Sequence, residues 1–436
     1  MDKLIEQFTI GRDKDLDVYL APFDILGSLA HTKMLTSIGL LTGDEFTQIE
    51  KELRALYEKT ETEGFVIEEG IEDVHSQVEL MLTEKLGDTG KKIHSARSRN
   101  DQVLLDLRLF SRNKIQSIVE QVTDVFAILQ EKSEQHKNDL VPGYTHLQVA
   151  MPSSFGLWFG AYAESLADDL ELLSAAFKVI NQNPLGSAAG YGSSFPINRT
   201  YTTELLGFDD LCYNVVYAQM GRGKSERVVA MAVSSLAATL SKFAYDSCLF
   251  MSQNFGFISL PDEFTTGSSI MPHKKNPDVF ELLRAKCNKI QSVANELTLI
   301  TNNLPSGYFR DLQILKESYF DLFDIIDECL DIVKLIVPQI KINKGILDNP
   351  IYDYLFSVEE VNKLVLNGVP FRDAYVQIGK DIANKKFHPE HKVEHTHEGS
   401  VGNLCTKEIK QKFITALAKF NFSTIEKAEK ALLGEK

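Results

Sequence analysis

The sequence predicts an all-α protein, with a central bundle of five long helices flanked by two smaller mainly helical domains. Glycine and proline, which interrupt helices, are absent from four long runs, and a fifth run contains only Gly160. Apolar residues inside these runs recur at three-and-four spacing, which is typical of helices packed nearly parallel in a bundle. The five runs are residues 101–141, 157–183, 224–255, 278–304 and 308–337.

The first run illustrates the pattern and its consequence. Ile115, Ile118, Val122, Val125 and Leu129 follow the helical period. At a rise of about 1.5 Å per residue, this run would reach roughly 60 Å. Helices of that length cannot bury their whole apolar stripe within one subunit, so we expect the chain to form an oligomer.

The regions on either side of the bundle contain shorter helical patterns. We expect an N-terminal mainly helical domain over residues 1–98, the bundle over 99–345 and a small C-terminal helical domain over 346–436. The expected flanking helices are residues 24–38, 42–60 and 73–86 in the first domain, and 358–366, 371–383 and 407–433 in the last.

Charge narrows the possible partners. The 436 residues carry a formal net charge of −15, which argues against nucleic acid because phosphate binding needs a clustered cationic face. An anionic substrate would have to be met by local cations, so basic residues inside motifs are informative.

The sequence also indicates a compartment. The N-terminal residues lack the apolar core of a signal peptide, and no apolar run is long enough to span a bilayer, so we expect no membrane contact. Five scattered cysteines without metal-binding spacing are typical of reduced thiols in the cytoplasm.

The segment most informative about function is residues 267–277, GSSIMPHKKNP. Small residues open it, Lys274 and Asn276 supply a cation and an amide, and Pro277 precedes a predicted helix. A helix N-terminus favours an anion, and the glycine and serines allow a loop that closes over a ligand. The segment is therefore suited to meeting a carboxylate and stabilising charge that develops on it.

This segment resembles the signature loop of the fumarase/aspartase superfamily, whose members eliminate fumarate from a substituted succinate. The resemblance implies that Ser268 is the base that removes a proton, and Ser269 is the neighbouring alternative. Lys274 and Asn276 would stabilise the dianion that forms. No cofactor is implied, because the carboxylate of the substrate holds the charge.

Residues 141–148, VPGYTHLQ, resemble the TH-x-Q segment of the same superfamily. The resemblance implies that Thr145 contacts substrate and that His146 transfers a proton to the leaving group. Glu281 falls where the family has a carboxylate paired with this histidine, and such a pair would favour the protonated ring.

Two further segments resemble the argininosuccinate lyase family. Residues 98–102, SRNDQ, imply that Arg99 and Asn100 hold substrate carboxylates. Residues 308–316 resemble the family pattern Y-x-x-D-L-Q-x-x-K, which implies that Tyr308, Gln313 and Lys316 contact the arginine-derived part of the substrate.

The resemblance implies reversible β-elimination of argininosuccinate to L-arginine and fumarate, in a cytoplasmic homotetramer whose active sites are shared between subunits. His273 stands where adenylosuccinate lyases often have histidine, so that enzyme is the alternative. A catalytically silent structural relative is an alternative of another class.

The histidines of residues 388–397 lie among Lys and Glu, and no metal site is assigned to them.

The sequence departs from the family pattern in two places. The usual F-N-x-S segment appears as residues 8–12, FTIGR, which leaves one substrate contact unassigned. Residues 221–227, GRGKSER, also differ from the usual sequence of the family at this place, and no role is assigned to them.

The glycine-rich residues 184–199 lack the Gly-Lys-Ser/Thr ending of a phosphate-binding loop, and we expect them to be a structural connection.

Overall fold

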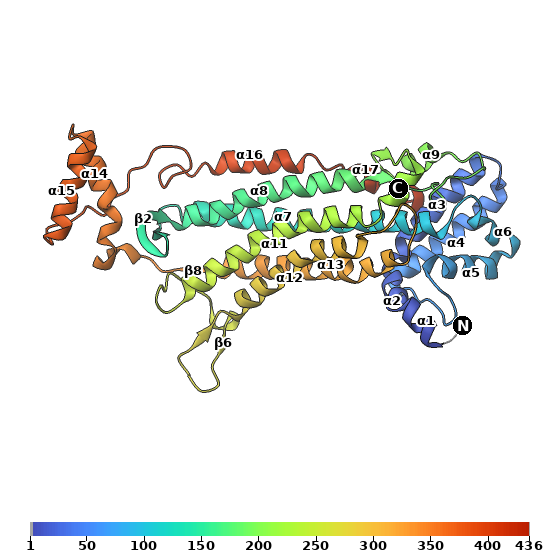
Figure 1. The fold of residues 1–436 in the computed structure, drawn as a ribbon, viewed down its shortest axis with the longest axis horizontal. Coiled ribbons are helices and arrows are strands. Elements are labelled where there is room, and N and C mark those ends of the chain that lie inside the picture. Colours follow the sequence, from blue (N-terminus) through green and yellow to red (C-terminus); the bar gives the residue numbers. More distant parts are fainter. Residues whose placement is uncertain (1–2, 436) are drawn as a thin grey trace.

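A computed structural model describes residues 3–435, and it is elongated (Figure 1). Its central part is the predicted bundle of five long helices. They are α7 (Arg99–Gln135), α8 (Phe155–Ile180), α11 (Lys224–Met251), α12 (Asp278–Thr301) and α13 (Asp311–Ile336). The predicted all-α fold class is confirmed, and each helix lies mainly within one of the five predicted runs.

Aromatic side chains join the helices of the bundle. Trp158 on α8 stacks on Phe243 of α11, with ring centroids 5.2 Å apart. Tyr319 on α13 is fully buried, and its hydroxyl lies 2.6 Å from Ser111 Oγ on α7. Full burial of one large apolar side chain stabilises a fold by about 1.5–3 kcal/mol, so this interior is the main source of stability.

Helix α11 bears on the expectation that no segment of the chain is apolar enough to span a bilayer. By length and composition it is apolar enough to cross a membrane, with a mean hydropathy of 1.4 over its best window. Serine and threonine interrupt its apolar residues, and for that reason no long apolar run stood out in the sequence. The window is 56% buried and the helix packs against α8 and α12, so we interpret α11 as a core helix of the bundle.

The N-terminal unit consists mainly of α3 (Ala21–Ser37), α4 (Gly43–Thr62) and α5 (Val74–Leu86), close to their predicted bounds. Helix α3 packs on α4 and on the start of α7. A capping box between Thr42 and Glu45 begins α4. The shorter helices of the unit are α1 (Lys3–Ile10), α2 (Asp13–Asp17), η1 (Val18–Leu20), α6 (Asp88–Lys91) and η2 (Lys92–His94).

A β-hairpin lies between α7 and α8, where the sequence predicted helix as far as residue 141. Helix α7 ends at Gln135, and strands β1 (Leu140–Thr145) and β2 (Gln148–Ser154) pair antiparallel. The remaining short elements are β3 (Gln182–Asn183), α9 (Arg199–Leu205), β4 (Asp210–Leu211), α10 (Val215–Met220), β5 (Ile258–Ser259), η3 (Asp262–Phe264), β6 (Thr266–Gly267), β7 (Lys275–Asn276), η4 (Val337–Gln339) and β8 (Lys341–Ile342).

Asp101 anchors the start of α7. Its Oδ1 accepts the Ser98 N–H at 2.8 Å, which completes the capping box that begins the helix. Its Oδ2 accepts the N–H groups of Gly186 at 2.9 Å and Ala188 at 2.8 Å, in the glycine-rich connection after α8. These contacts support the structural role expected for residues 184–199.

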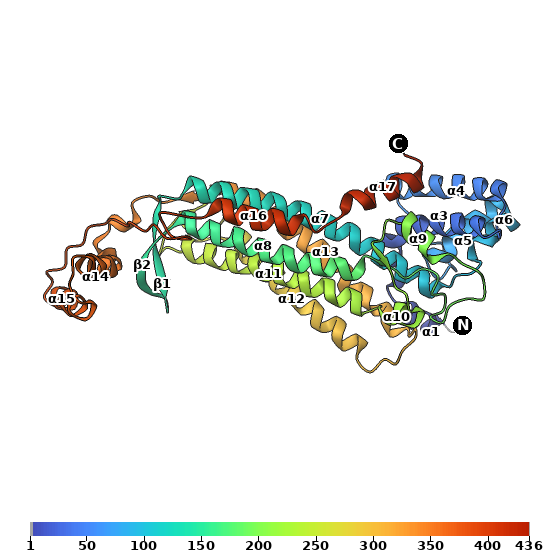
Figure 2. The same ribbon diagram turned by 90° about the horizontal axis from the view of Figure 1, so that it is seen from above.

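The C-terminal region divides between two places. Helices α14 (Ser357–Leu366) and α15 (Phe371–Ala383) follow η5 (Ile346–Asp348) and η6 (Pro350–Phe356), and they project beyond the bundle (Figures 1 and 2). Helix α16 (Thr406–Leu417) packs along α8, and α17 (Phe422–Leu433) contacts α3 and α9. We keep 1–98, 99–345 and 346–436 as a proposed division by chain order, although α16 and α17 share the core of the bundle.

The contacts of Asp101 predict a loss of stability on substitution. Asp101→Ala would leave the N–H groups of Gly186 and Ala188 without these acceptors and remove the Asp101 half of the capping box, while Ser98 still caps the helix. We expect the free energy of unfolding to fall by about 2–4 kcal/mol in chemical denaturation. Asp124→Ala, at an exposed position on the same helix, is the control and should change it by less than about 0.5 kcal/mol. Equal effects of the two substitutions would contradict the anchoring role.

Candidate active site

The sequence-predicted site residues fall into two groups. We call Thr145, His146, Ser268, Lys274, Asn276 and Glu281 the loop group, and Arg99, Asn100, Tyr308, Gln313 and Lys316 the helix-start group. The loop group is carried by the β1–β2 hairpin, the β6–β7 loop and the first turn of α12. The helix-start group is carried by the first turn of α7 and by the start of α13 with the loop before it.

His146 lies at the tip of the hairpin. Only His146 and Leu147 separate the two strands, and both have positive φ, 55° and 56°. A two-residue turn with both residues at positive φ matches the right-handed twist of a hairpin, although such a conformation is uncommon for residues other than glycine. Leu147 is 67% exposed, so this strained tip presents an apolar and an imidazole side chain outward.

Ser268 begins the loop between β6 and β7, which pair antiparallel. Its Oγ accepts the N–H groups of Ile270 at 3.3 Å and Met271 at 3.0 Å. Lys274 is exposed in the same loop, and the side-chain amide of Asn276 lies 3.5 Å from Thr266 Oγ1. The loop therefore holds a serine hydroxyl, a cation and an amide close in sequence and open to solvent.

The expected pair of His146 and Glu281 does not form within one chain. Across residues 3–435, neither side chain makes a hydrogen bond or an ion pair, and both are exposed. The elements that carry them, the β1–β2 hairpin and the start of α12 beside the β6–β7 loop, nevertheless lie toward the same end of the bundle (Figure 1).

The helix-start group, in contrast, lines one cavity of about 190 Å³ at the other end of the bundle. Carboxylates share this cavity. Arg99 Nη1 donates to Glu72 Oε2 at 3.0 Å and lies 3.3 Å from Asp73 Oδ2. Arg310 Nη2 donates to the other oxygen of Glu72 at 2.7 Å. Arg310 therefore bridges the start of α13 to the loop before α5.

Lys316 is buried, with 2% of its surface exposed, and pairs with two carboxylates of α2. Its Nζ lies 2.5 Å from Asp13 Oδ1 and also donates to Asp17. Burial raises the pKa of Asp13 to about 6, against the lowering effect of Lys316. The lysine that was predicted to meet a substrate carboxylate is thus neutralised by the chain itself.

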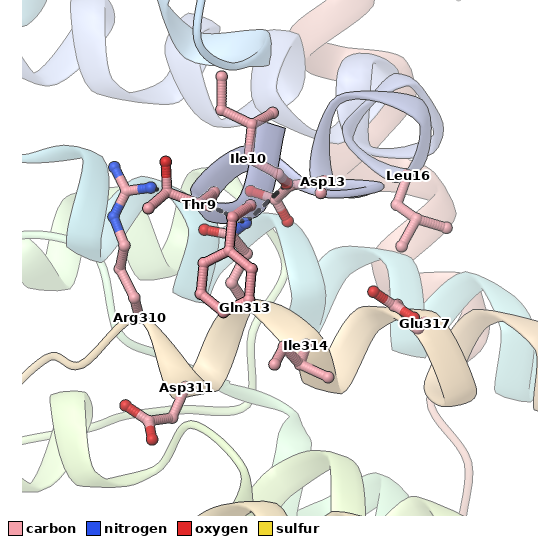
Figure 3. A pocket seen from close by; sticks show the side chains of 11 residues that line it. Thr9, Ile10, Asp13, Leu16, Arg310, Asp311, Gln313, Ile314 and Glu317 are labelled. Atoms are coloured by element: carbon pink, nitrogen blue, oxygen red, sulfur yellow. Dashed lines mark hydrogen bonds between the residues drawn. The ribbon is translucent and has the colours of Figure 1, made fainter. Parts of the chain in front are cut away.

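The side-chain amide of Gln313 also forms hydrogen bonds with the N-terminal segment. Gln313 Nε2 donates to the backbone oxygens of Thr9 at 3.1 Å and Ile10 at 2.9 Å. These contacts border a cavity of about 350 Å³ between α1, α2 and the start of α13 (Figure 3). The segment 8–12, which the sequence left without a role, therefore lies against the helix-start group.

A buried charge network supports this end of the bundle. His75 Nδ1 lies 2.7 Å from Asp24 Oδ1 and 3.6 Å from Asp106 Oδ2. Burial alone would lower the pKa of His75, but the Asp24 carboxylate raises it to about 9. The three groups are close enough to hold a metal ion, since their ligand atoms lie within 4.8 Å of one another. Because the imidazole lies between two carboxylates that can balance its charge, we interpret the cluster as a salt-bridge network.

The two groups lie at opposite ends of the bundle (Figure 1). Helix α7 alone has 37 residues between Arg99 and the hairpin, which corresponds to about 55 Å at 1.5 Å per residue. A small substrate cannot contact both groups of one chain. Motif resemblance identified the residues, but it could not reveal the acidic partners Asp13, Asp17 and Glu72, whose only signal was their position beside basic motifs.

Comparison with known proteins agrees with these motifs. A protein family described as Lyase matches residues 1–292. The chain is 63% identical to argininosuccinate lyase of Bacteroides fragilis over 436 residues, which cover 100% of this chain and 98% of that protein. It is 39% identical to argininosuccinate lyase of Thermotoga neapolitana over 386 residues, 88% of this chain and 97% of that protein.

Solved structures share the fold at low sequence identity. An EDDS lyase variant with bound fumarate has a TM-score of 0.76 at 21% identity, and the match covers 98% of this chain and 93% of that one. A class II fumarase from Schistosoma mansoni has a TM-score of 0.70 at 14% identity, with 97% and 91% covered. The long-helix bundle and its motifs define a lyase of the fumarase/aspartase superfamily. Within that superfamily, the chain belongs to the argininosuccinate lyase family.

The pKa of Asp13 predicts how a substitution depends on pH. A carboxyl group whose pKa is raised on folding retains a proton that the unfolded chain has lost, so its stabilising effect is lost as pH rises from about 4 to 6. We therefore expect Asp13→Asn to gain stability relative to the unsubstituted protein between pH 4 and pH 7. Denaturation at both pH values tests this, with the exposed neighbour Asp15→Asn as control. A difference that stays constant or falls with pH would contradict it.

Proposed function

We propose that this chain catalyses the reversible β-elimination of argininosuccinate to L-arginine and fumarate, a carbon–nitrogen lyase reaction of arginine biosynthesis. The observation that carries this proposal is identity of 62–63% over the whole chain to proteins named argininosuccinate lyase. The matched length includes every residue of the loop group and of the helix-start group.

Proton removal is assigned to Ser268. The proton beside a succinyl carboxylate is weakly acidic, and its removal leaves a dianion that the enzyme must stabilise more than the substrate. Two backbone N–H groups point at Ser268 Oγ, and hydrogen bonds to the charged form favour an alkoxide. No such bond reaches Ser269 Oγ in the described part of the chain, which supports Ser268 over its neighbour. Lys274 and Asn276 would stabilise the dianion.

Leaving-group protonation is assigned to His146, oriented by Glu281. Because these side chains do not meet within one chain, we propose that they meet across a subunit contact in a homotetramer. The strained, exposed hairpin tip supports this, since strain of that kind persists where a site requires it. Thr145, beside His146, would contact the substrate.

The helix-start group is assigned to substrate binding. Arg99, Asn100 and Tyr308 line the cavity near Gln313 and Lys316. Substrate carboxylates would compete with Glu72 for Arg99 and with Asp13 for Lys316, so binding replaces internal ion pairs by pairs to the ligand. No metal or cofactor has a role in these steps.

We place the enzyme in the cytoplasm. All five cysteines lie within the described residues and are free thiols, which agrees with a reducing compartment.

Fumarate release tests the function and its substrate. We expect purified protein to form fumarate, followed by ultraviolet absorbance, from argininosuccinate and not from adenylosuccinate. Fumarate from adenylosuccinate alone would show that His273 was the better guide to the substrate. Fumarate from neither compound would favour a silent relative.

Substitution of the two serines tests the base. We expect Ser268→Ala to lower kcat by about 10²–10⁴-fold, the usual contribution of a positioned acid or base. Ser269→Ala is the matched control in the same loop, and its kcat should fall by less than about tenfold. Full turnover by a folded Ser268→Ala protein would exclude the assignment.

A further inference from the structure

The segment 221–227, which resemblance left without a role, joins α10 to the N-terminus of α11. Gly223 has φ of 80° and is the N-cap residue. A Cβ atom there would lie 2.5 Å from Thr301 Cγ2, so both conformation and space require glycine. The Gly223 N–H donates to Glu226 Oε2 at 2.6 Å, which fixes the first turn of α11. These contacts fix the backbone of residues 221–227, and with it the positions from which the side chains of this segment extend.

Three cations of this segment line one cavity of about 200 Å³. Arg222, Lys224 and Arg227 face it, together with the loop that follows α12. None of the three forms an ion pair within residues 3–435. Glu226 of the same segment is buried, its Oε2 accepts the Gly223 N–H, and burial raises its pKa. Arg222 interacts electrostatically with Glu226 and Asp13, but no carboxylate is among the described residues that line this cavity. In a chain with a net charge of −15, three cations around one cavity are an unusual concentration of positive charge.

The same cavity contains polar groups that have no partner. Gln219 is only 1% exposed, and neither its Oε1 nor its Nε2 makes a hydrogen bond. Arg222 is 6% exposed and its Nε is also without a partner, although its Nη2 donates to Leu312 O at 3.1 Å. Buried polar groups without partners cost about 1–3 kcal/mol each, so their presence beside a cavity indicates a missing ligand.

Charge, size and helix geometry define the kind of ligand. The N-terminus of the 28-residue α11 contributes a positive dipole end to the cationic side chains. The cavity is smaller than the roughly 300–1,000 Å³ of sites for drug-sized molecules. We propose that Gln219, Arg222, Lys224 and Arg227 form a subsite for a free oxyanion of phosphate size. Nothing in this proposal depends on the reaction that the enzyme catalyses.

The subsite adjoins the helix-start group without coinciding with it. Arg222 lines both cavities, and its guanidinium carbon lies 5.6 Å from the ring centroid of Tyr308. Lys224 and Arg227 line only the anion cavity. An anion held there would therefore bind beside the predicted substrate contacts and reach them through Arg222.

Calorimetric titration of the full-length oligomer with inorganic phosphate tests the subsite. Ionic strength is kept constant with chloride so that screening does not change. We expect saturable binding, and we expect Lys224→Gln and Arg227→Gln each to weaken it by about five- to tenfold, because each removes one charge-assisted contact. Lys51→Gln, an exposed lysine on α4, is the charge-matched control and should bind phosphate as the unsubstituted protein does.

A second titration is made in saturating L-arginine, with circular dichroism to verify that the variants are folded. Retained phosphate binding would support a separate subsite. The proposal is overturned if phosphate shows no saturable binding, or if both variants bind it normally. It is also overturned if arginine abolishes binding, because the anion would then occupy the substrate cavity.

Discussion

The length of the bundle helices is the constraint on which the architecture of the active site depends. Helix α7 begins at Arg99, runs for 37 residues and is followed by the hairpin of His146, so one chain holds the two groups of predicted site residues at distant ends. Helix α12 repeats the arrangement, since it begins beside the β6–β7 loop and ends before Tyr308. The packed interior keeps these helices straight and the ends apart. Under the proposed function, association of subunits would bring the two ends together in one site.

At the helix-start end, the basic residues predicted to bind substrate are paired with carboxylates of the same chain. In the single chain, Lys316 is held by Asp13 and Asp17, and Arg99 by Glu72 and Asp73. These ion pairs offset the cost of burying the charge of the lysine. A substrate carboxylate would replace one anion by another, which changes the local charge little. The N-terminal segment 8–17 is therefore part of the site's electrostatics, even though its sequence departs from the family pattern.

Much of this could be predicted from the sequence. Helical periodicity identified the five bundle helices because their apolar stripes face one core, and motif order identified residues that the fold brings into two groups. The hairpin was missed because residues 136–141 contain no glycine or proline, although Pro142 and Gly143 follow at once. The partners of Lys316 and the unpartnered amide of Gln219 could not be predicted, because both arise from contacts between segments far apart in sequence.

The central claim is that no single chain contains a complete active site, and mixing of variants tests it most directly. His146→Asn and Arg99→Gln would each be inactive alone. Denaturing and reassembling them together should restore activity in about a quarter of the sites, since each site then draws its His146 and its Arg99 independently from a mixed pool. Arg99→Gln mixed with Asn100→Ala, both in one group, should stay inactive. Mixed oligomers of the first pair without recovered activity would contradict the claim.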